Sequence, residues 1–140
     1  MFNRILVPTD FSTCSQAALD LARTHFPEAV LILLHVIEPK RLASDSVEHM
    51  VSPINMGEIR QGMQDEAKGK LGALAEPNDE VLVVVGDPAE KILLLIDELR
   101  PEVVVMGTHG RKGLAHLLIG SVAEHVVRSA HVPVLVTKER

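Results

Sequence analysis

The chain has 140 residues, and its formal net charge is −5 with the histidines neutral. Proteins that bind nucleic acids usually present a basic face and aromatic rings on which bases stack. This composition offers neither, because acidic residues outnumber basic ones and the aromatic residues are three phenylalanines, with no Tyr or Trp. The longest apolar runs are far shorter than the ~20 residues that cross a bilayer, so we expect no nucleic acid and no membrane among the partners.

The same composition predicts one domain with an aliphatic core. A chain of this length has the common size of a single domain, so we assign residues 1–140 to one domain. A core of Val, Ile and Leu suits a parallel sheet that is covered on both faces. Cys14 is the only cysteine, which excludes an intramolecular disulfide and a Cys-based zinc cluster. Because no signal-like segment precedes the first predicted strand, we expect a cytoplasmic location.

The first third of the chain reads as strand, helix, strand. An apolar run predicts a strand over Arg4–Pro8, and Ser12 or Thr13 can cap the helix that follows. A second strand is expected near Ala29–Val36. The next segment, Glu38–Pro53, loses periodicity and is predicted to be a loop.

The middle of the chain repeats this alternation. A helix is predicted from apolar residues at helical spacing, which are Ile59, Met63, Ala67, Leu71 and Leu74. A third strand follows over Val81–Val85. Asp87, Pro88 and Glu90 then supply an N-cap, a proline at the first helical position and a capping glutamate for the next helix.

The last third predicts two more strands around one helix. The strands are Val103–Met106 and Val134–Thr137, and the helix is Ser121–Ala130. Pro133 before the last strand is typical of a sheet edge, where a missing donor is tolerated. Strands that alternate with helices indicate an α/β fold, an open five-stranded parallel sheet with helices on both faces. In such sheets, ligands bind beyond the carboxyl ends of the strands, where the strand order reverses.

A glycine-spaced loop between the fourth strand and the last helix is the segment most suggestive of chemistry. Gly107, Gly110 and Gly120 remove side-chain atoms that would keep backbone N–H groups away from an anion. Ser121 begins a helix whose first N–H groups and positive dipole end favour phosphate. Arg111 and Lys112 add positive charge nearby. The loop is therefore predicted to bind the phosphates of a nucleotide, although neither of the two common phosphate-loop motifs is present.

The spacing Gly107-x-x-Gly110, nine residues, then Gly120-Ser121 resembles the ATP-binding motif of the universal stress protein family. Further segments are similar to other strands and turns of that family; they are Ile5 to Ser12, Leu34-His35-Val36, Val85 to Pro88 and Val132 to Val136. The resemblance covers nearly the whole chain and is weakest over residues 38–53. It implies a Rossmann-like sheet with strand order 3-2-1-4-5, and membership of the branch that binds ATP.

The resemblance also implies residue roles. Asp10 would accept hydrogen bonds from the ribose, and the backbone of Val36 would pair with adenine. Gly107 would let the ribose approach, while Gly120 and Ser121 would hold phosphates bridged by Mg²⁺. The complete expected contact set is Pro8, Thr9, Asp10, Val36, Met106, Gly107, His109, Gly110, Arg111, Gly120 and Ser121.

Simpler roles stay open for several of these residues. Asp10 could cap the first helix, and His109 could be a solvated loop residue. Arg111 and Lys112 could belong to a solvent-exposed turn that contacts no ligand. His35 is expected in the core, and Cys14 is expected to act as a small hydrophobe.

We expect an ATP-binding regulator of a stress response, because the loop contains no evident general base and no Walker-type lysine. Two alternatives remain, a slow ATPase or autophosphorylating enzyme and a nucleotide-free interaction module. The family resemblance further implies a homodimer paired through the last strand, Val132 to Thr137, whose exposed edge would otherwise be a liability. A downstream protein partner is expected but is not identified by the sequence.

Overall fold

The computed structural model describes residues 1–40, 56–109 and 119–138. Its strands are β1 (Arg4–Pro8), β2 (Val30–Ile37), β3 (Glu80–Val85), β4 (Val103–Gly107) and β5 (Val134–Thr137). Its helices are α1 (Thr13–His25), α3 (Met56–Leu74), α4 (Pro88–Leu99) and α5 (Ser121–Ser129). The strands form one parallel sheet in the order β3-β2-β1-β4-β5, which confirms the predicted α/β fold and strand order.

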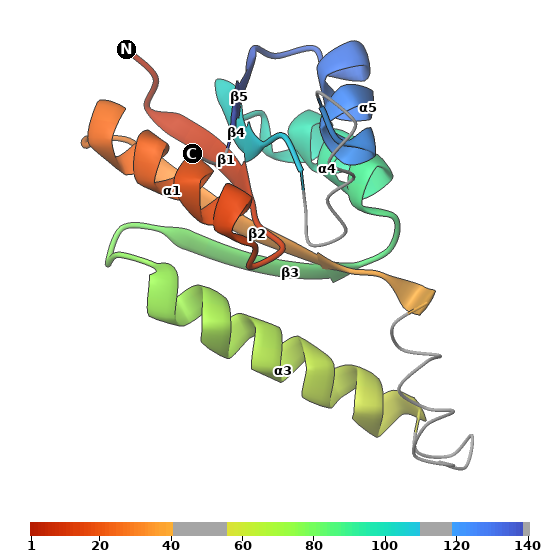
Figure 1. Ribbon diagram of the computed structural model, residues 1–140. Helices are drawn as coiled ribbons and strands as arrows, with labels where there is room; N and C mark the ends of the chain where they lie inside the picture. The colour runs from red at the N-terminus through yellow and green to blue at the C-terminus, as the bar shows by residue number, and fades with distance from the viewer. Residues whose placement is uncertain (41–55, 110–118, 139–140) are drawn as a thin grey trace.

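Two helical layers cover the sheet, with α1 and α3 on one face and α4 and α5 on the other (Figure 1). Alternation along each strand decides which layer a side chain joins, because successive residues of a strand point to opposite faces. The layer beneath α1 and α3 contains Ile5, Val7, Leu31, Leu33, Val103 and Val105 from the strands. The layer beneath α4 and α5 contains Leu6, Ile32, Leu34, Val104 and Met106. Both layers are aliphatic, as the composition predicts.

Two helix starts follow their predicted caps. Ser12 is the N-cap of α1, and its side chain accepts a hydrogen bond from the backbone of Ser15. Asp87 is the N-cap of α4, where its carboxylate accepts the Glu90 N–H at 3.1 Å behind Pro88 in the first turn. Each such cap satisfies a donor that the helix itself leaves without a partner.

Most predicted element boundaries agree with the structure within one or two residues. The predicted loop Glu38–Pro53 lies mainly outside the described residues, and the two residues Pro39 and Lys40 within it are helical. The strand β2 extends one residue beyond its predicted end, to Ile37, where it pairs with Val85 of β3.

The sheet has its switch point between β1 and β4. The chain proceeds outward from β1 to β2 and β3 on one side, and from β4 to β5 on the other. The β1–β2 ladder continues to Pro8 paired with Leu34, whereas the β1–β4 ladder contains only Ile5 with Val103 and Leu6 with Val104. The last residues of β1 and β4 are therefore not paired with each other, and the carboxyl edge at this position is where an open α/β sheet binds ligands.

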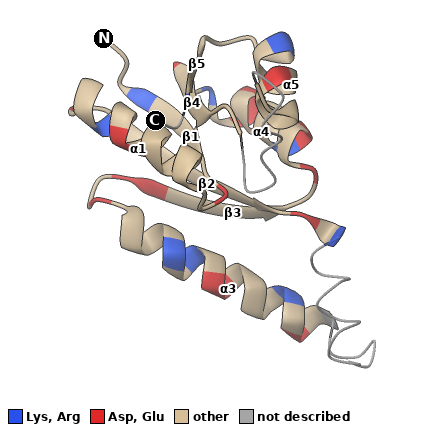
Figure 2. Cartoon of the chain, in the orientation of Figure 1, with Lys and Arg blue, Asp and Glu red and all other residues tan. Residues whose placement is uncertain are grey.

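Charged residues do not divide the described chain into basic and acidic faces. Basic and acidic positions are interspersed along α1, α3 and α5 (Figure 2). No helix among the described residues is both long enough and apolar enough to cross a membrane.

Candidate functional site at the β1–β4 switch point

Two loops meet at the switch point. We call residues 9–12 together with Ser15 the β1 rim, and residues 107–109 together with 119–121 the β4 rim. Parallel strands bring the carboxyl ends of β1 and β4 to the same edge of the sheet, so both rims lie there.

The β1 rim is a network of side-chain hydrogen bonds. The Ser15 hydroxyl donates to the Ser12 carbonyl at 2.9 Å, so its oxygen accepts at 2.9 Å from the Thr9 hydroxyl. The Thr9 oxygen in turn accepts the backbone N–H of Phe11 at 3.1 Å. Thr9 and Ser15 are both buried, and a hydroxyl group has one donor and two acceptor positions that this network employs. The polar groups of the rim are thus held in one arrangement.

Asp10 lies within this network, half-buried at the end of β1. Its carboxylate accepts the Ser12 N–H at 3.0 Å, which makes a local side-chain turn ahead of α1. The N-cap of the helix is Ser12, so the simpler role weighed for Asp10, that of capping residue, is filled by its neighbour. Asp10 therefore belongs to the turn between β1 and α1 and is not the cap of the helix.

The β4 rim is shaped by missing side chains. A Cβ at Gly107 would lie 2.7 Å from the Cys14 sulfur and 2.9 Å from the Cys14 carbonyl carbon. The first turn of α1 therefore packs directly on the last residue of β4, and that close approach explains why position 107 requires glycine. The expected approach of a ribose to Gly107 remains a prediction.

Thr108, the residue after Gly107, connects the end of β4 to β5, to α5 and to α1. Its backbone N–H donates to the Thr137 carbonyl of β5 at 2.9 Å, and its carbonyl accepts the N–H of Gly120. Its buried hydroxyl lies 3.6 Å from the Cys14 sulfur and 3.1 Å from His109 Nδ1. The Thr108 backbone thus ties the start of α5 to the end of the sheet.

Gly120 is a close contact as well as a helix cap. A Cβ at this position would collide with the Thr108 carbonyl oxygen, so glycine is required here too. The expectation that the Gly120 N–H is available to an anion is corrected, because this N–H is donated to Thr108. The first hydrogen bond of α5 joins Glu124 to Gly120, so the donors at the helix start are the N–H groups of residues 121–123. Ser121 is exposed at the first helical position.

The backbone of Val36 has the orientation expected for a ligand contact. Leu34 accepts the Thr9 N–H, so its backbone groups face β1, while Ile37 accepts the Gly86 N–H on the β3 side. Alternation along β2 therefore directs the N–H and C=O of Val36 toward β1, past Pro8, the last residue of that strand.

The remaining expected contacts have separate outcomes. Met106 has its side chain in the core and pairs with Val136 of β5, so it reaches the switch point only through its neighbour Gly107. His109 is partly exposed beside Thr108. Gly110 and Arg111 lie outside the described residues, as does Lys112.

Among the described residues, no group of three or more His, Cys, Asp or Glu side chains is placed to hold a metal ion. A magnesium ion usually binds through one or two carboxylates together with substrate phosphates and water. Binding of Mg²⁺ together with a nucleotide therefore remains a prediction.

Sequence reasoning missed two parts of the site. Ser15 was not singled out, although its position three residues after the cap Ser12 is a usable signal for a second hydroxyl in the first turn. Cys14 is buried as predicted, yet it lies at the joint between Gly107, Thr108 and Thr137. Only the packing of α1 on β4 reveals that position.

Comparisons with known proteins agree with this architecture. Universal stress protein MJ0577 of Methanocaldococcus jannaschii is 29% identical, over 100% of this chain and 97% of the relative. The solved structure of MJ0577 superposes with a TM-score of 0.82 at 32% identity, covering 100% of this chain and 98% of that one. Universal stress protein YxiE of Bacillus subtilis is 31% identical, over 99% of this chain and 100% of the relative.

A solved universal stress protein in complex with cAMP superposes with a TM-score of 0.63 at 26% identity, covering 99% of this chain and 98% of that chain. The family model described as the universal stress protein family matches residues 1–138. The chain therefore belongs to the universal stress protein family.

Proposed function

We propose that this protein binds ATP at the β1–β4 switch point and acts as a nucleotide-responsive regulator in a stress response. The observation that carries the proposal is the pairing of a carboxylate on one rim with a helix N-terminus on the other. Asp10 suits ribose hydroxyls, and the N–H groups of residues 121–123 at the start of α5 suit phosphates.

Adenine is the base that the site favours. The Val36 N–H and C=O form a donor and an acceptor on the side of β2 that faces β1, beyond the last pair of that ladder, which suits the donor and acceptor on an adenine edge. The relative solved with cAMP carries an adenine nucleotide, which supports the same ligand class for this chain.

The affinity expected from these groups is sufficient for regulation. A hydrogen bond to a charged oxygen contributes about 1.5–3 kcal/mol, and micromolar affinity needs about −8 kcal/mol. Four such bonds at the upper end of this range contribute about 12 kcal/mol, which leaves about −8 kcal/mol after a cost of about 4 kcal/mol for association.

The variant Gly120→Val combined with Ser121→Ala tests the phosphate side. We expect more than about a hundredfold loss in ATP affinity by calorimetry, because the valine displaces the start of α5 and the alanine removes a hydroxyl donor. Ser121→Ala alone should cost about tenfold. Gly69→Ala is the matched control, since Gly69 is exposed and a Cβ there meets nothing within 4 Å. Unchanged ATP affinity in the folded double variant would contradict the site.

The regulatory part of the proposal requires that bound ATP persists. Denaturing freshly purified protein and separating the released small molecules should give close to one ATP per chain. Recovery of ADP instead would indicate turnover and support the enzymatic alternative. Absence of any adenine nucleotide, together with no calorimetric response to ATP and Mg²⁺, would favour a nucleotide-free interaction module.

We also propose that the protein is a homodimer paired through β5. This strand is one edge of the sheet, and Leu135 on it is 39% exposed. An apolar edge strand is a template for pairing with a second copy. Light scattering at micromolar concentration should give twice the 15.3 kDa chain mass, and Leu135→Lys should shift the mass toward the monomer. A monomeric mass for the unaltered chain would exclude this arrangement.

A further inference from the structure

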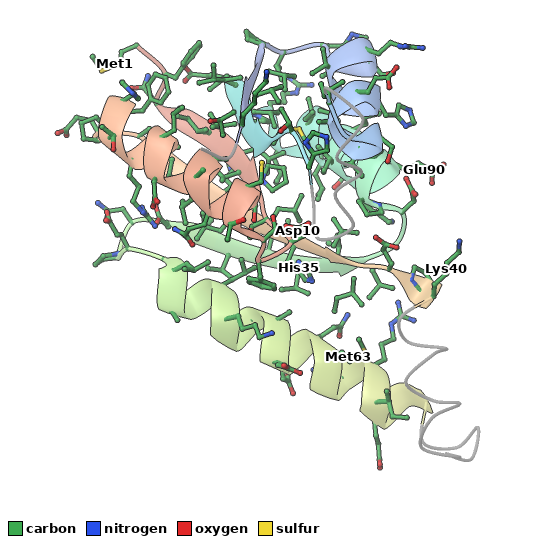
Figure 3. The ribbon with its side chains drawn as sticks, viewed as in Figure 1. Met1, Asp10, His35, Lys40, Met63 and Glu90 are labelled. Atoms are coloured by element: carbon green, nitrogen blue, oxygen red, sulfur yellow. The ribbon has the colours of Figure 1, made fainter. Side chains whose placement is uncertain are left out.

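His35 contacts both residues that flank Asp10 in the sequence. It lies on β2 with only 7% of its surface exposed, on the side of the sheet that α1 and α3 cover. Figure 3 shows His35 and Asp10 in the same region, at the end of the sheet above α3. It contacts Thr9, which precedes Asp10, and Phe11, which follows it.

The first contact fixes the backbone before Asp10. His35 Nδ1 lies 2.8 Å from the Thr9 carbonyl oxygen. Because a carbonyl oxygen can only accept, Nδ1 carries the proton and donates it. The Thr9 N–H is meanwhile donated to Leu34 at 2.8 Å. Both backbone polar groups of Thr9 are therefore held by neighbouring residues of β2.

The second contact fixes the backbone after Asp10. Phe11 has a φ of 65°, in the left-handed region that is uncommon for a bulky residue and persists only where its surroundings hold it. The Phe11 ring lies against the His35 ring, with centroids 4.6 Å apart and planes tilted by 37°. The Lys70 ammonium of α3 lies over the same phenyl ring, 5.2 Å from its centroid. The unusual turn at Phe11 is thus supported from β2 and from α3.

We infer that His35 is a positioning residue for Asp10, and that it thereby determines how tightly this carboxylate binds the ribose of the bound nucleotide. The inference rests on the proposed function, because it assigns to Asp10 the ribose contact proposed above. His35 holds the residues on either side of Asp10, so the carboxylate is presented at one place and one angle. A loss of this hold affects recognition of the ribose while the contacts of Ser121 and Val36 remain.

Discrimination between ATP and 2′-deoxy-ATP measures this role. The unaltered protein should bind ATP about ten- to hundredfold more tightly, because the deoxy analogue lacks one hydroxyl that donates to a carboxylate. His35→Leu keeps the bulk and removes the donor, and we expect its ratio of dissociation constants to fall below about threefold. His35→Asn places an amide N–H near the position of Nδ1, and it should recover part of the ratio.

A matched histidine and a second variant keep the test decisive. His25→Leu changes an exposed histidine at the far end of α1, and its ratio should equal that of the unaltered protein. Should His35→Leu fail to fold, Phe11→Leu removes the ring contacts with His35 and Lys70 and leaves the bond from His35 to Thr9, and it should also lower the ratio. Wild-type discrimination in a folded His35→Leu or Phe11→Leu protein would overturn the inference.

A measurement without nucleotide separates this inference from the proposed function. The N–H groups of Phe11 and Ser12 are donated to Thr9 and Asp10, so their hydrogen exchange reports on the rim itself. Exchange should be several-fold faster in His35→Leu than in the unaltered protein. In His35→Asn it should be slower than in His35→Leu. Equal rates in all three proteins would overturn the positioning role. Absence of ATP binding with the expected exchange pattern would instead count against the proposed function alone.

Discussion

The β1 rim and the β4 rim face the same edge of the sheet, yet they are built by opposite means. On the β1 rim, Thr9, Asp10, Ser12 and Ser15 hold the backbone through side-chain hydrogen bonds. On the β4 rim, close backbone approach takes the place of side chains, and two glycines make that approach possible. The first rim should therefore be sensitive to loss of a polar atom, and the second to addition of a single carbon.

Gly107→Ala gives the largest effect expected from this difference. The added Cβ would press on both the sulfur and the backbone of Cys14, so α1 must move away from β4. Overpacking of this kind typically lowers the free energy of unfolding by about 1–3 kcal/mol. Urea denaturation followed by circular dichroism measures the change.

Two further variants sharpen the interpretation of Gly107→Ala. Gly69→Ala adds the same carbon on the exposed side of α3, and it should raise the free energy of unfolding by about 0.5–1 kcal/mol. Cys14→Ala in the Gly107→Ala background should recover only part of the loss, because two of the three nearest atoms are backbone atoms. Full recovery would show that the sulfur alone sets the spacing.

A smaller effect separates the two threonines that follow β1 and β4. Thr9→Val removes the donor to Ser15 and the acceptor for the Phe11 N–H, which should lower the free energy of unfolding by about 1–2 kcal/mol. Thr108→Val removes a long contact to Cys14 and one to a partly exposed histidine, and it should cost less than about 1 kcal/mol. The difference between the two denaturation midpoints tests the comparison.

A larger loss of stability in Thr108→Val than in Thr9→Val would contradict the difference drawn between the two rims. In that case the Thr108 hydroxyl, and not only its backbone, would organise the β4 rim. The backbone bonds of Thr108 to Thr137 and Gly120 are unaffected by valine, so the variant isolates the hydroxyl.

The fold was accessible to sequence reasoning because its signals are local and periodic. Alternating apolar runs predicted β1 and β5 with their observed bounds, and the Asp87-Pro88 pair predicted the start of α4. Strand order came from the family resemblance and not from periodicity, since pairing between distant strands leaves no mark on a single segment. Residues 41–55 and 110–118 lie outside the described part of the chain, so predictions that fall on Gly110 and Arg111 remain predictions.

The site was only partly accessible for the same reason. Glycines at 107 and 120 drew attention as features that expose backbone to an anion. The structure supplies a second reason, since each makes room for another part of the chain, Cys14 in one case and Thr108 in the other. Nothing in the local sequence indicates which atoms lie opposite a missing Cβ.

The sequence by itself determined the aliphatic two-layer core, the alternation of strands and helices, and the family to which the chain belongs. Local propensities, caps and the two-residue period of strands act over a few residues, so they can be read in one dimension. Tertiary structure decided that His35 of β2 contacts the residues on either side of Asp10, and that α1 packs against Gly107. These contacts join residues that are 26 and 93 positions apart, and they exist only after parallel pairing has brought separate strands to one edge.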